Sequence, residues 1–82
     1  MASKSSSVSL QSARSRVGAN IRRLRKAMDG KVSQEKLGEW AECHRTYVSQ
    51  LERAKTNISI DRLERFAKIL GVDIVELFKP TS

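Results

Sequence analysis

Two groups of residues in this sequence are of types that could do chemistry, and both lie between positions 43 and 53. Cys43 and His44 have the types of a nucleophile and its base. However, neighbours on a tight turn rarely point at each other, and the chain has no second histidine to replace or orient the base. One cysteine and one histidine also cannot supply the three or four ligands of a zinc site. We therefore expect no enzyme activity, no metal and no cofactor, and we interpret Cys43 as a small buried hydrophobe.

The second group forms the polar side of a short helix that the sequence predicts from Arg45 to about Arg53. With about 100° per residue, Val48 and Leu51 fall on the side that faces a core, and polar residues fill the opposite side. The polar residues are Arg45, Thr46, Ser49, Gln50 and Arg53. Arginine and glutamine form paired hydrogen bonds with guanine and adenine, and serine and threonine make short adaptable contacts. An exposed helix with this face suits the major groove of DNA.

A helix and a tight turn directly before this segment would fix its orientation. Ser33 is a favourable N-cap for a short helix that ends near Ala41. The three residues Glu42-Cys43-His44 then separate the two helices. Helices joined so closely must cross steeply and pack through small residues, and Gly38 is the small residue at the expected crossing. The segment from Ser33 to Arg53 therefore predicts two helices joined by a tight turn.

Three further helical segments surround this unit. The first begins near Ser12 and is ended by Asp29-Gly30, the next runs from the N-cap Ser59 to Gly71, and the last is a short turn at residues 74–78. Their expected inward-facing residues are Val17, Ile21, Leu24, Met28, Ile60, Leu63, Phe66, Ala67 and Leu70. Since no segment alternates with period two, the chain is predicted to be all-α with five short helices.

The length and charge of the chain narrow its organisation and its partners. Eighty-two residues allow one compact domain, which we place at residues 13–79, with a flexible arm at 1–12 and a tail at 80–82. The net charge is +7, and the basic excess lies within residues 1–31, which hold eight basic residues and one acidic residue. This asymmetry indicates a polyanionic partner, either nucleic acid or an anionic membrane surface.

The same composition bears on location. No apolar run is long enough for a transmembrane helix or a secretory signal, and a single cysteine fits a reducing compartment, so we expect a cytoplasmic protein. Residues 1–28 are rich in serine and arginine and contain no acid, which leaves a mitochondrial transit peptide as an alternative.

The stretch SQEKLGEWAECHRTYVSQLER followed by NISIDRLERFAKILGV resembles the Cro- and Xre-like helix-turn-helix repressor family, over about Val17 to Phe78. Within that family it is most similar to the controller proteins of restriction-modification systems, through His44-Arg45-Thr46-Tyr47 and Asn57-Ile58-Ser59. The resemblance implies a five-helix domain that regulates transcription. Such a protein binds a near-palindromic operator as a homodimer, with the helix near Arg45 in the major groove.

The resemblance also assigns roles to individual residues. The expected base-reading residues are Arg45, Thr46, Tyr47, Ser49 and Gln50. The expected phosphate contacts are Gln34, Arg53, Lys55 and Asn57. Arg25 and Glu52 match a buried ion pair that joins the first helix to the recognition helix. For each of these residues the alternative is an ordinary solvated surface position.

The sequence departs from the family pattern at several positions. Glu42 stands where the family's turn usually has glycine, so we expect a differently shaped turn. His44 replaces the usual cap residue, and Thr46 is an alternative source of the cap. Two extra residues lengthen the loop at 28–32, and Trp40, which the family lacks, is expected to be partly buried.

The remaining expectations concern partners. Ile74, Val75 and Phe78 are candidates for the dimer interface, with Leu77 in the core, and the alternative is that all three lie in the core. The arm residues Lys4, Arg14 and Arg16 are candidates for contacts with the DNA backbone or minor groove. RNA polymerase is a further candidate partner. Two other functions stay open: an antitoxin or adaptor that uses the same fold to bind protein, and a basic amphipathic segment at residues 13–28 that lies on a membrane.

Overall fold

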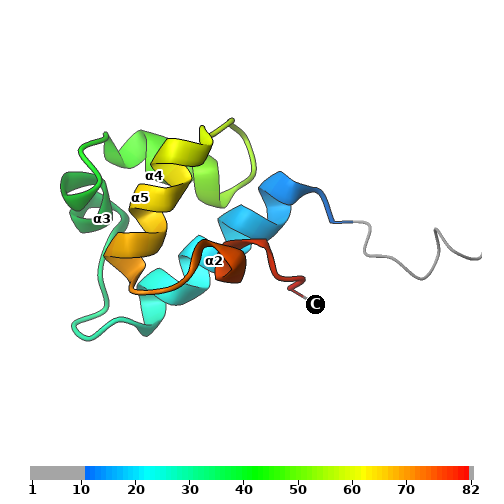
Figure 1. Cartoon of the computed structure of the whole chain (residues 1–82). Helices are drawn as coiled ribbons and strands as arrows, with labels where there is room; N and C mark the ends of the chain where they lie inside the picture. The colour runs from blue at the N-terminus through cyan, green and yellow to red at the C-terminus, as the bar shows by residue number, and fades with distance from the viewer. Residues whose placement is uncertain (1–10, 82) are drawn as a thin grey trace, which may run out of the picture.

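The computed structural model describes residues 11–81 of the chain, and within this range it contains helices and no strand. The helices are α2 (Ala13–Ala27), α3 (Gln34–Trp40), α4 (Arg45–Glu52), α5 (Ile60–Leu70) and the 3-10 helix η1 (Ile74–Phe78), arranged as shown in Figure 1. The prediction of an all-α fold is confirmed. The prediction of five α-helices is wrong for the described residues, because the last element is a single 3-10 turn.

Local hydrogen bonds explain why η1 is not an α-helix. Asp73 caps the element with its side chain on the Val75 N–H, and its carbonyl accepts from Glu76 N at 2.9 Å, three residues on. Only five residues separate this cap from Lys79, whose backbone is extended before Pro80. A segment of this length closes few α-helical hydrogen bonds, so the tighter 3-10 turn forms instead.

Serine caps set the starts of the longer helices. The hydroxyls of Ser12, Ser33 and Ser59 accept from the backbone N–H three residues ahead in α2, α3 and α5. Gly71 ends α5 in the left-handed conformation, with φ 75°, as the sequence predicts. Gly30 does not end α2 directly, since Met28 is already extended and Gly30, with φ 84°, lies further along the loop.

The core forms where α2, α3, α4, α5 and η1 meet. Its buried side chains are Val17, Ile21, Val32, Leu37, Ala41, Val48, Leu51, Leu63, Phe66, Ala67, Leu70 and Leu77. Two expectations about the core are corrected. Ile60 is 71% exposed, because it is the first residue of α5 and lies outside the packed turns, and Leu24 and Met28 are only partly buried.

A buried polar residue joins the two ends of the domain. The side-chain amide of Asn20 in α2 donates to Leu77 O at 3.0 Å and to Lys79 O at 2.9 Å. These bonds satisfy carbonyls at the end of η1 and hold η1 against α2. Asn20 was not among the residues predicted to be buried, although its place between Val17 and Ile21 on the apolar stripe is the signal of a buried hydrogen-bonding side chain.

The ends of the described region lie together. Gln11 Nε2 donates to Thr81 O at 2.7 Å, and Thr81 N donates to Gln11 Oε1 at 2.9 Å. The predicted flexible arm is described only at Gln11 and at Ser12, the cap of α2, and Lys4 lies outside the described residues. Arg14 and Arg16, which were predicted as arm residues, lie in α2 instead. Within residues 11–81, no helix has the length and hydropathy that crossing a membrane requires.

Candidate nucleic-acid interface

Two glycines let the neighbouring helices approach α4 at close range. A Cβ at Gly38 in α3 would lie 2.7 Å from Cys43 O in the turn, and a Cβ at Gly18 in α2 would lie 2.4 Å from Leu51 O at the end of α4. Both distances are shorter than a real Cβ contact, so neither helix could keep its position with a larger residue. α4 is therefore held at both of its ends. The role of Gly38 was predicted from sequence, whereas that of Gly18 was not.

The turn before α4 has the shape that a glycine would give it. Glu42 adopts φ 58°, in the left-handed region, so the prediction of a differently shaped turn is wrong. This conformation costs about 1–2 kcal/mol for a residue with a side chain. Two contacts maintain it: Cys43 N donates to Gly38 O at 2.8 Å, and the Glu42 carboxylate pairs with Arg65 of α5 at 2.7 Å.

His44 caps α4 itself. Its Nδ1 accepts from Thr46 N at 3.0 Å, so Thr46 does not supply the cap and its hydroxyl is left free. α4 ends at Glu52, one residue before the predicted boundary, and Arg53 is its C-cap. Ala54 follows with φ 60°, so residues in strained conformations stand on both sides of α4. Such strain is concentrated at functional sites in proteins.

The outer face of α4 carries polar side chains that no described residue engages. Arg45 and Thr46 are exposed, and Ser49 and Gln50 are half-buried. None of these four side chains makes a hydrogen bond or ion pair within residues 11–81. The inner residues Val48 and Leu51 are buried, so the helix cannot rotate to hide its polar side. The four side chains are therefore available to an external partner.

Tyr47 differs from the other predicted base-reading residues. Its hydroxyl donates to Asn57 O at 2.9 Å, and its ring lies 5.1 Å from the guanidinium of Arg62 in α5. Burial raises the pKa of the Tyr47 hydroxyl, and the nearby Arg62 charge partly opposes this effect. Tyr47 therefore braces α4 against the following loop, and its contact with DNA stays a prediction.

Arg25 and Glu52 form a buried, two-pronged ion pair between α2 and α4. Arg25 Nε lies 2.7 Å from Glu52 Oε2, and Arg25 Nη2 lies 2.9 Å from Glu52 Oε1. Arg25 also donates to Val32 O at 2.9 Å, and Gln34 Nε2 donates to Glu52 Oε1 at 3.0 Å. The pair therefore ties α2, the loop and α3 to the last turn of α4. The contact of the Gln34 amide with Glu52 was not predicted from sequence, and the phosphate contact of Gln34 stays a prediction.

The loop after α4 carries the remaining predicted phosphate contacts. Arg53 and Lys55 are exposed, and Asn57 Oδ1 accepts a hydrogen bond from Arg14 Nη2 at the start of α2. The Arg14 contact brings a third cationic side chain to this loop. No sequence signal pointed to it, because Arg14 and Asn57 are 43 positions apart.

Cys43 and His44 each have structural contacts of their own. The Nδ1 of His44 is occupied by the cap, and Cys43 is partly buried against the core. Burial raises the pKa of the Cys43 thiol, partly offset by the Arg62 charge, so this environment disfavours the thiolate that a nucleophile needs.

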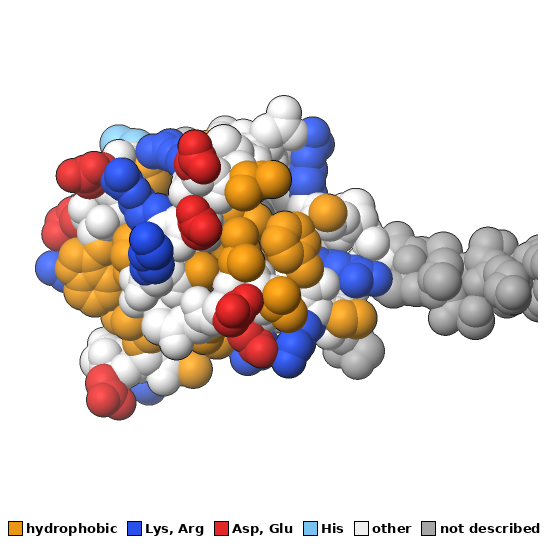
Figure 2. Space-filling model, in the orientation of Figure 1, with side chains coloured by type: hydrophobic (Ala, Val, Ile, Leu, Met, Phe, Trp, Pro, Cys, Tyr) orange, Lys and Arg blue, Asp and Glu red, His pale blue; other side chains and the backbone are white. Residues whose placement is uncertain are grey.

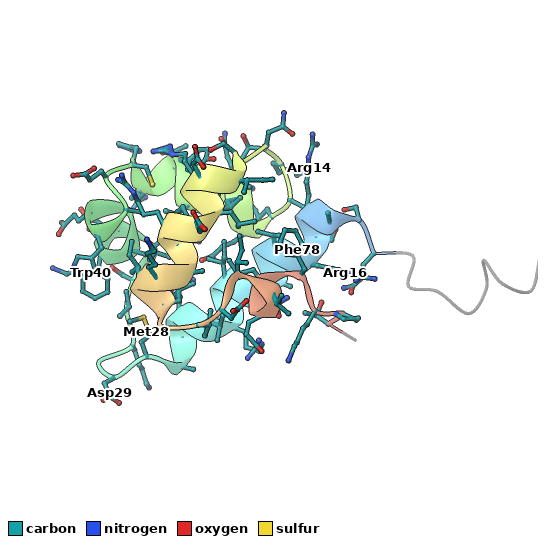
Figure 3. All side chains as sticks on the ribbon, in the orientation of Figure 1. Arg14, Arg16, Met28, Asp29, Trp40 and Phe78 are labelled. Carbon is teal, nitrogen blue, oxygen red and sulfur yellow. The ribbon has the colours of Figure 1, made fainter. Side chains whose placement is uncertain are left out.

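A second exposed surface is apolar. Ile60, Val75 and Phe78 are 71%, 59% and 40% exposed, and a mainly apolar hollow of about 290 Å³ adjoins Ile60 and Phe78. Figure 2 shows hydrophobic side chains gathered on this face, and Figure 3 places Phe78 among them. Leu77 is buried, as predicted, whereas Ile74 packs partly against the core. We name Ile60, Val75 and Phe78 the apolar patch.

Trp40 lies elsewhere on the surface. It is 46% exposed and stands beside the loop containing Asp29, away from Phe78 (Figure 3). The expectation that Trp40 is partly buried is confirmed, since slightly more than half of its surface is covered.

Helices α3 and α4, joined by a tight turn and supported by α2 and α5, define a helix-turn-helix domain. The family model described as "Helix-turn-helix domain" matches residues 16–77. The chain therefore belongs to the helix-turn-helix family of DNA-binding transcription regulators, and the resemblance seen in its sequence is confirmed.

Individual relatives point in the same direction. The chain is 38% identical over 65 residues to control protein C.BamHI of Bacillus amyloliquefaciens, covering 79% of each protein. Its fold is similar to that of the restriction-modification controller protein C.AhdI from Aeromonas hydrophila, with a TM-score of 0.71, 34% identity and coverage of 79% of this chain and 91% of that one. It is also similar to the hypothetical transcription factor NHTF from Neisseria, with a TM-score of 0.78, 34% identity and coverage of 89% and 82%.

Proposed function

We propose that this chain is a cytoplasmic, non-enzymatic transcription regulator that binds a near-palindromic operator as a homodimer. The observation that carries this proposal is the outer face of α4, where four polar side chains have no partner among the described residues. Because the inner face of α4 is buried, these side chains point outward together. They are of the types that read base edges in the major groove.

The contacts divide by chemistry. Arg45, Thr46, Ser49 and Gln50 read bases, and Tyr47 contacts a phosphate, a thymine methyl or the edge of a flexible base step. Gln34, Arg53, Lys55 and Asn57 lie on the elements before and after α4, and they contact phosphates that fix the register of the domain on DNA. The net charge of +7 adds attraction that is independent of sequence.

A homodimer supplies the specificity that one domain lacks. One α4 reaches few base pairs, and a second copy related by two-fold symmetry doubles the number. The apolar patch supports this arrangement, because its exposed hydrophobic side chains lie beside a hollow. In a two-fold dimer, the side chains of each copy can pack into the hollow of the other. The dimer interface predicted from sequence contained Ile74, Val75 and Phe78. We now include Ile60, which is exposed, in place of Ile74, which packs partly against the core.

The likeness to C.BamHI and C.AhdI supports a more specific role, the control of a restriction-modification system. In that role the bound dimer acts on RNA polymerase at a nearby promoter, by blocking or recruiting it. Neighbouring genes for a restriction endonuclease and a DNA methyltransferase would support this role, and their absence would argue for another regulated gene.

Selection of bound sequences from random duplex DNA tests the main proposal. We expect two related half-sites whose centres lie about one helical turn, ~34 Å, apart. Enrichment of a single unpaired half-site would contradict the homodimer, and no enrichment would contradict sequence-specific binding.

The same protein sample distinguishes the other functions. An antitoxin or adaptor would show a tight protein partner and only weak operator affinity. A membrane-surface protein would bind anionic vesicles through the apolar stripe of α2. DNA is favoured over a membrane because Val17 and Ile21 of that stripe are buried within the domain.

A further inference from the structure

A basic hollow lies where α2, α3 and α4 meet, next to the polar face of α4. Its volume is about 270 Å³, and it is lined by Arg22, Arg25, Gln34, Ser49, Glu52 and Arg53. Three arginines therefore surround one glutamate. Arg22 lies in α2 and was not among the residues predicted to contact DNA.

The glutamate does not neutralise the hollow. Both oxygens of Glu52 are engaged, Oε2 by Arg25 and Oε1 by Arg25 and Gln34, so this negative charge is already paired. Arg22 makes no hydrogen bond or ion pair with any residue in the range 11–81. Arg53, the C-cap of α4, donates only from Nε, at 3.4 Å, to Ser49 O of that helix. The guanidinium groups of Arg22 and Arg53 thus border the hollow with no acidic partner among the residues described. Their positive charge favours the binding of an anion in the hollow.

The shape and position of the hollow select the kind of anion. All of its lining residues are polar or charged, whereas cofactor pockets are mostly apolar, so it suits one compact charged group better than a cofactor. Guanidinium groups match the oxygens of a phosphate through paired hydrogen bonds. Ser49 lines the hollow and also belongs to the outer face of α4, so a group bound here lies beside the bases that α4 would read.

We propose that this hollow binds one phosphate of the DNA backbone in each half-site, with Arg22 and Arg53 as its two cationic ligands. The proposal rests on the proposed function, and it adds α2 to the DNA-contacting surface. A phosphate held there contacts both helices that the Arg25–Glu52 pair joins, so the same junction orients α4 and anchors it to the duplex.

The test uses the full chain and an operator obtained by selection. The variants are Arg22→Ala and, as a control that removes the same charge from α5, Lys68→Ala. Each protein is measured on the operator, on random duplex DNA, and on operators carrying a neutral methylphosphonate at one backbone position at a time. Arg22 is exposed and has no described partner, so its truncation should leave the melting temperature unchanged, which circular dichroism checks.

We expect Arg22→Ala to weaken binding about ten-fold on operator and random DNA alike, and to reduce the slope of log affinity against log salt by about one. One methylphosphonate position per half-site should weaken the wild type and Lys68→Ala, with a penalty at least three-fold smaller for Arg22→Ala. Equal penalties in all three proteins at every position, or equal affinities of Arg22→Ala and Lys68→Ala, would overturn the phosphate site. Absence of any preferred sequence for the wild type would instead refute the proposed function.

Discussion

The outer face of α4 and the apolar patch are both exposed, but they are supported differently. α4 is fixed by close glycine contacts at both ends and by a buried ion pair, whereas η1, which carries Val75 and Phe78, is held by the buried Leu77 side chain and by hydrogen bonds from Asn20 and Arg16 to its last carbonyls. Hydrogen bonds to bases depend strongly on direction, and apolar burial does not. The difference teaches that a polar recognition surface depends on close backbone contacts and an oriented ion pair beneath it, while an apolar surface needs only that its helix stay packed on the core.

Removal of the buried Arg25–Glu52 ion pair should have the largest effect, a loss of stability in the support of α4. Glu52→Ala leaves Arg25, which is 7% exposed, as a buried charge without its partner. We expect the free energy of unfolding to fall by about 3–5 kcal/mol, measured by urea denaturation. Glu39→Ala breaks only the exposed pair with Lys36 and should change stability by less than about 1 kcal/mol. Equal stabilities of the two variants would show that α4 does not depend on the buried pair.

A charge in the apolar patch should separate the copies without unfolding them. Val75→Asp places a carboxylate at an exposed position of the monomer, but in a dimer this carboxylate becomes buried and unpaired. We expect dimerisation to weaken by about 2–4 kcal/mol, measured by analytical ultracentrifugation. Trp40→Asp is the matched control, since Trp40 is exposed but outside the patch. A dimer lost with Trp40→Asp and kept with Val75→Asp would place the interface on the other surface.

Truncation of the first residue of α4 should reveal whether its face reads sequence. Arg45→Ala should lose about 1–3 kcal/mol of affinity for the operator and relax the preference at one base pair per half-site. The measurement is a titration against operators with single substitutions. The same loss on operator and random DNA would identify Arg45 as a phosphate contact only.

The smallest effect is expected in the loop after α4. Lys55→Ala removes an exposed charge and should weaken binding to all duplexes by about 0.5–1 kcal/mol, with a salt slope lower by about one. Fluorescence anisotropy over a range of salt concentrations measures both quantities. A change in base preference would show instead that this loop takes part in reading sequence.

The sequence predicts those parts of the fold that depend on local chemistry. Ser33, Ser59 and Gly71 mark helix ends because their side chains or conformations act on neighbouring backbone, and this relationship is visible within a few residues. The burial of Val48 and Leu51 follows from helical spacing in the same way. The helix-turn-helix unit and the outer face of α4 could therefore be predicted.

Features that depend on distant partners could not be predicted. The Glu42 turn keeps the shape typical of glycine with help from Arg65, 23 positions away, and the Arg14 contact places a charge at Asn57. Ile60 fits an inward pattern by spacing, yet it lies in the first turn of α5, where the rest of the fold leaves it uncovered. The basic hollow likewise needs three helices to be placed before Arg22 and Arg53 can be seen to share it.

Helix α2 contacts α4 through Gly18 and η1 through Asn20, which are two residues apart in its sequence. The surface that would pair two copies and the helix that would enter the groove are therefore both packed against α2. In a dimer, the distance between the two copies of α4 is then set by the packed helices of each domain rather than by a flexible linker. An operator with one base pair added at its centre must be accommodated by twisting or bending of the DNA, so its affinity should depend on how deformable that central sequence is.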